Sequence, residues 1–326
     1  MPTHTDTAWT DRLSAVMPTN FMDNLSNNFT ANTNLLDTMI NRIGLTVVSG
    51  VDNPYNPFAK YTSTVVDVGD TVQKYKMDYV KGEQYDPDNT NPFTSTKNKP
   101  YAMYATLDDS IQYHDRINRY EFSKAFTSDA MLGDFVSSKL DALYESDGLD
   151  KYTKWKKYMS DGDKFGVVES VKFDTSATPD TDVFAGNLWD AIRKYANSKF
   201  RQPNSDYNVA KMTAISPSVD VIMRADDKLD IDKYLKGVYN LDKTAVDANI
   251  ILVDDFAELD NPAVAGDTEL CAIVADSRAF EYYPRTPEAG SIYNPKGLNM
   301  EYYLTIQGTY CANRFRNCVG LVKSNA

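Results

Sequence analysis

The side chains best suited to acid–base or nucleophilic chemistry are few in this sequence, which contains two histidines, His4 and His114. His4 lies in a polar segment, so a Ser-His-Asp or Cys-His site would have to be built on His114. The surrounding run Gln-Tyr-His-Asp-Arg favours a surface or interface histidine that is hydrogen-bonded to a neighbour. The short sequence patterns of metalloproteases, serine hydrolases and nucleotide-binding loops do not occur.

Carboxylates are abundant, but they occur side by side. General acid–base catalysis needs two carboxylates held apart in a cleft, in unlike environments, whereas adjacent side chains on a strand or helix point in different directions. The pairs are therefore interpreted as solvated. A glycosidase-like pair from distant parts of the sequence stays open as an alternative. The adjacent or near-adjacent aspartates are Asp108 and Asp109, Asp226 and Asp227, Asp230 and Asp232, and Asp254 and Asp255.

The sequence predicts no metal site and no cofactor. Residues 86–91 resemble the start of a calcium loop but lack the glycine and the glutamate that such a loop needs, so a solvated turn is expected. The three cysteines, Cys271, Cys311 and Cys318, have no C-x-x-C spacing and no histidine nearby. We expect them to be reduced and buried as small apolar side chains.

Composition excludes several classes of protein. A hydrophobic content of 42% in 326 residues is enough for a sizeable core. The 46 acidic residues outnumber the 34 basic ones, and the net charge of −12 argues against a protein that grips nucleic acid through a basic stripe. It is compatible with enclosing DNA without adhering to it. Neither a secretory signal nor an apolar run long enough to span a membrane is present.

The first third of the chain is predicted to be extended. Residues 1–57 are rich in Asn, Thr and Asp and end in a proline-broken stretch, which predicts an arm with one short helix over residues 29–43. Alternating runs over residues 62–68 and 72–80, with a turn between them, predict a β-hairpin system. A hairpin cannot bury both faces by itself and needs a partner. The alternative is a surface loop that packs its tyrosines on its own domain.

The remainder alternates between helical and strand patterns. Residues 127–159 have a helical period, with Gly148 as a potential break, so one long helix or two stacked helices are expected. The following segments are predicted as a helix over 183–200, a strand over 210–215, a helix from Pro217 to about 225, and strands over 250–256, 270–275, 298–309 and 315–322.

This succession resembles the Hong Kong 97-type capsid fold of tailed bacteriophages. The resemblance rests on the order of elements, on the strand-Ser-Pro passage over residues 211–217, and on the late runs 250–256, 272–280 and 304–322. It implies an α+β fold with an N-terminal arm, an extended hairpin loop, a long spine helix, and peripheral and axial domains. The implied ranges are 1–57 for the arm, 58–105 for the extended loop, 106–182 for the peripheral domain with the spine helix, 183–290 for the axial domain and 291–326 for the closing strands.

The resemblance implies a structural protein and not an enzyme. Copies would assemble as pentamers and hexamers into the icosahedral head of a phage, similar to those of small short-tailed phages, around double-stranded DNA that is not specifically bound. The chain begins almost directly with the arm, which implies a separate scaffolding protein. A portal protein and decoration proteins are further expected partners, with no membrane. The lysine, asparagine and glutamate of covalently crosslinked shells have no match, so a noncovalent shell is expected, made in the bacterial host cytoplasm and located in the virion.

The aromatic side chains of the extended loop are the predicted contacts with a neighbouring subunit. Large rigid aromatic groups bury area at low entropic cost. Two alternatives remain open: an encapsulin-like compartment with the same fold, distinguished by a cargo enzyme, and a soluble hydrolase that uses distributed carboxylates. The predicted contact residues are Tyr75, Tyr79, Tyr85 and Phe93.

Overall fold

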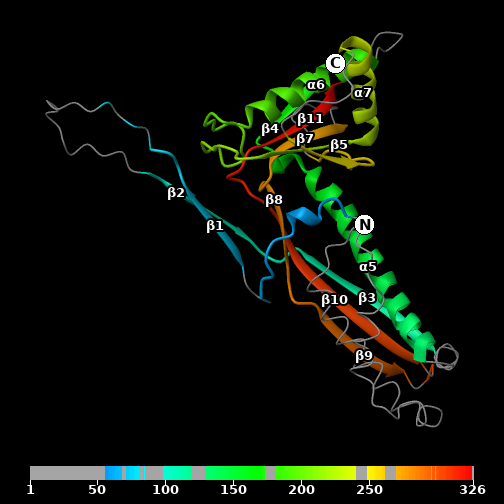
Figure 1. Cartoon of the computed structure of the whole chain (residues 1–326). Helices are drawn as coiled ribbons and strands as arrows, with labels where there is room; N and C mark the ends of the chain where they lie inside the picture. Colours follow the sequence, from blue (N-terminus) through cyan, green and yellow to red (C-terminus); the bar gives the residue numbers. More distant parts are fainter. Residues whose placement is uncertain are drawn as a thin grey trace.

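The computed structural model describes residues 56–67, 71–80, 98–118, 129–172, 181–239, 248–260, 269–294 and 299–324, with Gly82, Gln84, Lys296 and Gly297 between them. The predicted arm up to residue 55 and its helix over 29–43 lie outside the described residues. Figure 1 shows three parts: a helix-covered sheet, a long helix beside a second sheet, and a hairpin that projects away from both. The α+β prediction is confirmed.

The larger sheet has five strands in the order β4-β11-β7-β5-β6. Its central strand β7 is buried along its whole length, and β11 is nearly so, which explains their almost continuous apolar sequences. Helices α6 (Thr181–Ser198) and α7 (Ala225–Tyr239) cover one face. The strands are β4 (Val167–Lys172), β5 (Val219–Arg224), β6 (Asn249–Val253), β7 (Leu270–Asp276) and β11 (Cys318–Ser324).

Two predictions in this region are wrong. Residues 210–215, predicted to form a strand, have no regular secondary structure, and the helix predicted from Pro217 does not form there. The apolar run after the proline is strand β5, which pairs with β6 and β7, and the helix begins at Ala225. A short apolar run has no periodicity that separates a buried strand from a helix, so the Ser-Pro start signal misled the prediction.

The smaller sheet is built on β10 (Asn299–Ala312), to which three strands pair antiparallel. Its partners are β3 (Asp109–Asn118), β8 (Phe280–Pro284) and β9 (Glu288–Asn294). Helix α5 (Asp129–Met159) runs beside this sheet (Figure 1) as one uninterrupted helix of 31 residues. The long helix is thus confirmed, and Gly148 does not break it. The Tyr113 hydroxyl on β3 lies between two aspartates of α5, 3.0 Å from Asp150 Oδ2, to which it donates, and 3.4 Å from Asp147 Oδ1.

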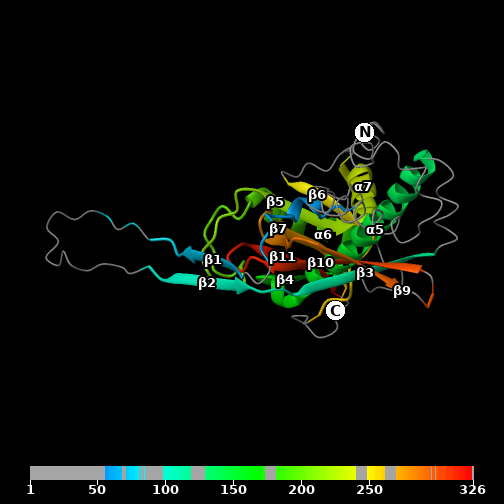
Figure 2. The same ribbon diagram turned by 90° about the horizontal axis from the view of Figure 1, so that it is seen from below.

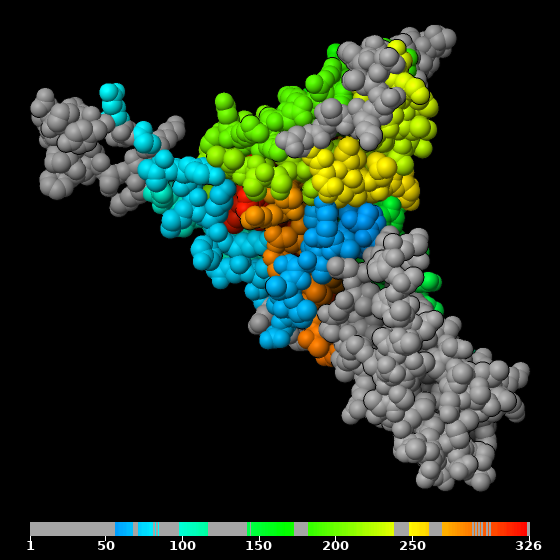
Figure 3. Space-filling view, viewed as in Figure 1, coloured from blue at the N-terminus to red at the C-terminus, as the bar shows by residue number. Residues whose placement is uncertain are grey.

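An aromatic cluster joins the two sheets. Phe58 and Tyr61, which flank and end the short helix η1 (Ala59–Tyr61), pack with Trp155 of α5 and Phe280 of β8. The Tyr61 hydroxyl donates to the buried carboxylate of Asp220 on β5 at 3.1 Å. Residues 56–67 therefore bridge the larger sheet and β8, and Figure 3 shows this segment, in blue, over the junction.

The hairpin strands differ from the predicted ones. The hairpin pairs β1 (Val72–Met77) with β2 (Pro100–Ala105). Residues 62–68, predicted as its first strand, do not form a strand in the part described. Instead Thr62 and Val66 make isolated bridges to Tyr282 and Arg285. This segment pairs with the body because its backbone hydrogen bonds go to the edge of β8.

Candidate assembly surface

The hairpin has two chemically different faces, because side chains alternate along its strands. Residues facing away from the body are exposed and those facing it are partly buried on both strands. On the exposed face, Tyr75 is 80% exposed, Tyr104 is 64% exposed and Met77 is 62% exposed. We call this the outer face; it consists of Gln73, Tyr75, Met77, Pro100, Ala102 and Tyr104, which are cross-strand partners in the register.

The opposite face carries charged side chains that bind the body of the same chain. Lys74 donates to Glu281 of β8, and Thr213 donates to Asp78 just beyond the end of β1. Burial lowers the pKa of Lys74, but the hydrogen bond to Glu281 and the neighbouring acidic groups together outweigh burial, so the pKa is raised overall. The hydrogen bond from Thr213 lowers the pKa of Asp78. The alternation of Lys, Tyr, Lys, Met and Asp thus separates a body-binding face from an aromatic one.

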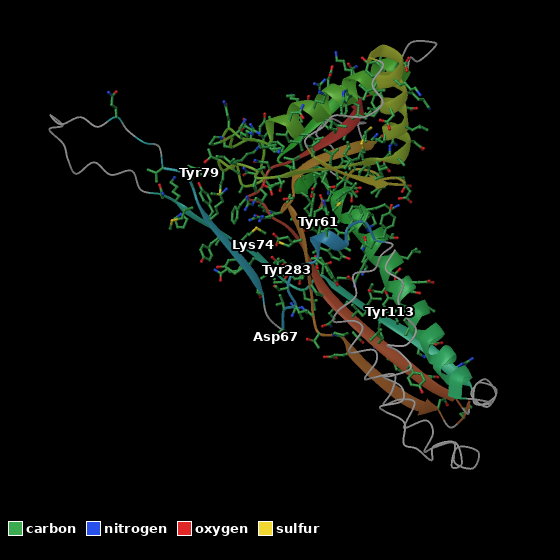
Figure 4. The ribbon with its side chains drawn as sticks, viewed as in Figure 1. Tyr61, Asp67, Lys74, Tyr79, Tyr113 and Tyr283 are labelled. Carbon is green, nitrogen blue, oxygen red and sulfur yellow. The ribbon has the colours of Figure 1, made fainter. Side chains whose placement is uncertain are left out.

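The predicted contact residues fall into two groups. Tyr75 and Tyr79 lie on the hairpin and its extension, and both are exposed, Tyr79 to 48%; Figure 4 labels Tyr79 toward the far end of the hairpin. Tyr85 and Phe93 lie outside the described residues. That these side chains contact another subunit stays a prediction. Met77 and Tyr104 were not among the residues predicted from the sequence. The alternation of side chains along the two strands could have indicated both, because it places them on the same face as Tyr75.

The histidine that could have been catalytic is part of a polar surface ladder. His114 lies on the side of β3 that faces away from α5, where its ring stacks on Tyr303 at 4.8 Å between centroids. Its Nε2 lies 3.7 Å from Glu301 Oε2, and the Tyr303 hydroxyl donates to the same carboxylate oxygen at 2.9 Å. His114 thus lies at the surface as predicted, but its contacts with these neighbours are a ring stack and a 3.7 Å approach to a carboxylate instead of the predicted hydrogen bond.

Six of the eight aspartates in these adjacent or near-adjacent pairs form ion pairs with lysine or arginine side chains. Asp254 and Asp255 are exposed, and both accept from Lys156 at the end of α5. Burial raises the pKa of Asp254, but the hydrogen bonds from Tyr152 and Lys156 have the larger combined effect and lower the pKa to about 2. The other four of these six ion-paired aspartates are Asp109 with Lys154, Asp227 with Arg224, Asp230 with Lys233 and Asp232 with Lys228.

The cysteines are buried as expected. Cys271, Cys311 and Cys318 are free thiols, and burial raises the pKa of Cys271 to about 12. A thiol with so high a pKa is a poor nucleophile at neutral pH. Among the residues that the structure describes, no group of three or more histidine, cysteine, aspartate or glutamate side chains is arranged to hold a metal ion. None of the described helices is both long and apolar enough to cross a membrane.

The match to a family of known proteins covers almost the whole chain. The model of the Phi29-like phage major capsid protein matches residues 3–322. The chain belongs to this family. The family is one of capsid proteins, so the prediction of a structural protein and not an enzyme is confirmed. The predicted kinship to tailed-phage capsid proteins is confirmed by the same match.

Individual members of the family are distant in sequence. The chain is 27% identical over 305 residues to the major capsid protein of Bacillus phage B103, and 25% identical over 278 residues to that of Streptococcus phage Cp-1. The alignments cover 90% and 81% of this chain, respectively. The chain spans 64% of the length of the B103 protein and 76% of the Cp-1 protein.

Solved capsid structures share the fold at low identity. A chain in the capsid structure of Staphylococcus phage Andhra superposes with a TM-score of 0.59 at 12% identity, over 84% of this chain and 86% of that one. A chain in the capsid of cyanophage P-SCSP1u does so with a TM-score of 0.54 at 9% identity, over 95% and 96%. The predicted Hong Kong 97-like fold is confirmed. Long helix α5, the projecting hairpin and the helix-covered sheet are its recognisable parts in this chain (Figures 1 and 2).

Proposed function

We propose that this chain is the shell-forming subunit of a phage head. Copies assemble as pentamers and hexamers into an icosahedral shell that encloses double-stranded DNA. Membership of the Phi29-like major capsid family supports this, together with the fold. A closed shell requires head-to-tail contacts, in which one patch of each copy binds a different patch of the next, repeated around each axis. A projecting element with an unoccupied apolar face supplies one half of such a contact.

The outer face of the hairpin is the observation that carries the proposal. Single exposed apolar side chains are common, whereas a contiguous apolar strip marks an interaction site. Tyr75 and Tyr104 stand on neighbouring strands of that strip, and Met77 continues it toward the tip. A two-stranded hairpin buries too little surface to be stable alone, so a neighbouring copy covering this face would also stabilise the hairpin. We therefore assign the strip, together with Tyr79, to the contact with the neighbouring subunit.

The electrostatics are consistent with a container for DNA. With a net charge of −12 the subunit repels phosphates on average, so DNA is enclosed without specific binding. We further propose a scaffolding protein, a portal protein and decoration proteins as partners. The chain is made in the host cytoplasm and ends in the virion. Three buried free thiols are compatible with synthesis in a reducing compartment.

The domain assignment also belongs to the proposal. The five-stranded sheet with α6 and α7 acts as the axial domain, and α5 with the sheet on β10 acts as the peripheral domain. In this assignment the axial sheet takes β4 from the range expected for the peripheral domain, and β11 from the expected closing strands. Strand β4 forms one edge of the larger sheet and pairs with β11, although the two strands lie far apart in the sequence.

The test is negative-stain electron microscopy of the protein expressed alone and with a scaffolding protein. The parent should give closed particles, whereas the double variant Tyr75→Ser with Tyr104→Ser should give soluble subunits or small oligomers. Both side chains are exposed, so the fold should tolerate the changes. Leu229→Ser on α7, 54% exposed, is the matched control and should still form particles. Deletion of residues 84–99 should also stop assembly. Normal shells from the double variant would contradict the proposed role of the outer face.

A further inference from the structure

The body-facing side of the hairpin forms a set of polar contacts with the rest of the chain. Lys74 binds Glu281, whose carboxylate also accepts from the Tyr283 hydroxyl. Two residues along, the Lys76 amine lies 3.4 Å from the Thr213 carbonyl oxygen and 3.5 Å from that of Phe315. Asp78, two residues further, accepts from the Thr213 hydroxyl. We call these contacts of Lys74, Lys76 and Asp78 the hairpin latch; Figure 4 shows Lys74 beside Tyr283.

The latch contacts lie outside the two buried hydrophobic clusters of the body. Among the residues that the structure describes, neither buried hydrophobic cluster contains a residue of β1 or β2. The hairpin also meets the rest of the chain through β2, which contacts β10 and runs on toward β3, and through the segment before β1, which is tied to β8. That tie includes a 2.7 Å hydrogen bond from Arg285 Nη1 to the Asp67 carbonyl oxygen.

The surface that receives the latch is rigid. The loop that carries Thr213 is held by two fully buried amides, Asn208 and Asn317. Asn208 Oδ1 accepts from the Met212 backbone N–H at 2.8 Å, and Asn317 Nδ2 donates to the Ala214 carbonyl oxygen at 3.3 Å. Buried amides with satisfied hydrogen bonds specify one loop conformation, because every alternative leaves polar atoms unpaired. Asp78 and Lys76 therefore bind a loop whose conformation is already fixed by the buried amides.

The Lys74–Glu281 ion pair is shielded from water enough to contribute to holding the hairpin. The side chains are 15% and 20% exposed, so water screens them less than it screens a surface pair. Removing one partner would leave a partly buried charge without its counterion, and replacing one charge by its opposite would make the pair repel.

We infer that Lys74 and Glu281, with Asp78 and Thr213, are positioning residues that set the hairpin at the angle needed to meet the neighbouring copy. The inference rests on the proposed function. A hairpin already at the right angle loses less freedom on binding, which favours assembly. An error in its angle would be repeated at every contact around a ring, and the ring would fail to close.

The angle can be measured in the unassembled chain. Cysteines introduced as Ala102→Cys on the outer face and Asp190→Cys on α6 carry spin labels, since both positions are exposed and the native thiols are buried. Electron–electron double resonance then gives the distribution of distances between the labels. We expect one narrow distribution in the parent, a broadened one after Lys74→Glu, and a narrow one again when Lys74→Glu is combined with Glu281→Lys.

Assembly is the second readout. Lys74→Glu should cause loss of closed particles in favour of open or irregular ones, with recovery in the double reversal, while thermal unfolding of the unassembled chain changes little. Thr213→Val, which removes only the hydroxyl that binds Asp78, should broaden the distances in the same direction. The matched control reverses the exposed Lys233–Asp230 pair on α7 and should alter neither readout.

The outcomes separate this inference from the proposed function. Unchanged distances in both Lys74→Glu and Thr213→Val would overturn the latch. Broadened distances with normal closed particles would overturn its positioning role. Normal particles from the Tyr75→Ser and Tyr104→Ser variant would contradict the proposed role of the outer face, and a parent chain that forms no particles alone or with a scaffolding protein would contradict the proposed function. Neither result would affect the distance measurement in the unassembled chain.

Discussion

At the scale of single residues, close packing against a neighbouring side chain decides which residue a position accepts. Gly308 on β10 is the clearest case, since a Cβ atom there would lie 2.2 Å from the Tyr282 hydroxyl oxygen and 2.3 Å from Cζ of the same ring. Tyr282 belongs to the aromatic cluster that joins the two sheets. A methyl group at residue 308 would therefore push a buried ring out of that cluster.

Gly308→Ala is predicted to lower the free energy of unfolding by about 1–3 kcal/mol, the usual effect of overpacking a core. Denaturant unfolding of the unassembled chain measures it. Gly290→Ala on β9 is the control, because a Cβ atom there meets nothing within 4 Å. Equal stability of the two variants would show that the Tyr282 ring can shift without a loss in the free energy of unfolding.

The lowered pKa of Asp254 predicts that the free energy of unfolding depends on pH. The pKa of Asp254 is lowered to about 2 in the folded chain, from about 3.9 in an unfolded one. The stabilisation is therefore present above about pH 4 and is lost as the pH falls toward 2. The effect is small because the side chain is 65% exposed and salt screens it.

The variant Asp254→Asn should be slightly less stable than the parent at pH 6 and should lose this difference near pH 2. Denaturant unfolding at both pH values, at low ionic strength, measures the difference. A difference that stays constant across this range would rule out the ion pair with Lys156 as its source.

At the scale of elements, the loop over residues 208–216 shows how a few polar side chains replace regular structure. Its backbone is paired with amide side chains and not with a neighbouring strand. Asn208→Ala would leave the Met212 N–H and carbonyl groups unpaired and buried. We predict a loss of about 2–4 kcal/mol in the free energy of unfolding, since each buried orphan group costs about 1–3 kcal/mol.

Thermal or denaturant unfolding measures this loss. Asn187→Ala on α6 removes an amide that also bonds to a backbone carbonyl oxygen, but at an exposed position, and it should change stability much less. If both variants were equally stable, the amide network would not be what holds the loop.

Elements were predictable where a local period was strong. Helix α5 and helix α6 follow from their repeating apolar positions, and β7 and β11 from compact apolar runs. Strand β5 and helix α7 were missed because their sequences are locally ambiguous. Strands β8 and β9 were not predicted at all, since both take their strand form from pairing with β10.

At the scale of the whole molecule, net charge should control the rate of assembly. Subunits with a net charge of −12 repel one another over a distance set by the ionic strength. Raising the salt concentration from about 0.01 M to about 0.15 M shortens the screening length from about 30 Å to about 8 Å. Assembly should therefore become faster with added salt.

Light scattering during assembly measures this dependence. Because the outer face of the hairpin is uncharged and mostly apolar, the contact proposed for it should not weaken over the same range of salt concentration. Slower assembly at the higher salt concentration would mean that attraction between opposite charges, and not apolar contact, dominates the association of subunits.

The sequence by itself determined the fold class, the long helix, the absence of known catalytic patterns and the resemblance to capsid proteins. These depend on composition, on periodicity within a few turns or strands, and on the order of segments. The tertiary structure decided what depends on residues far apart. It set the pairing of β4 with β11, the irregular loop held by Asn208 and Asn317, and the side of the hairpin that binds its own body. The local sequence pattern shows that side chains alternate between the two faces of a strand. Which of the two faces is buried depends on the surfaces that folding places against the strand.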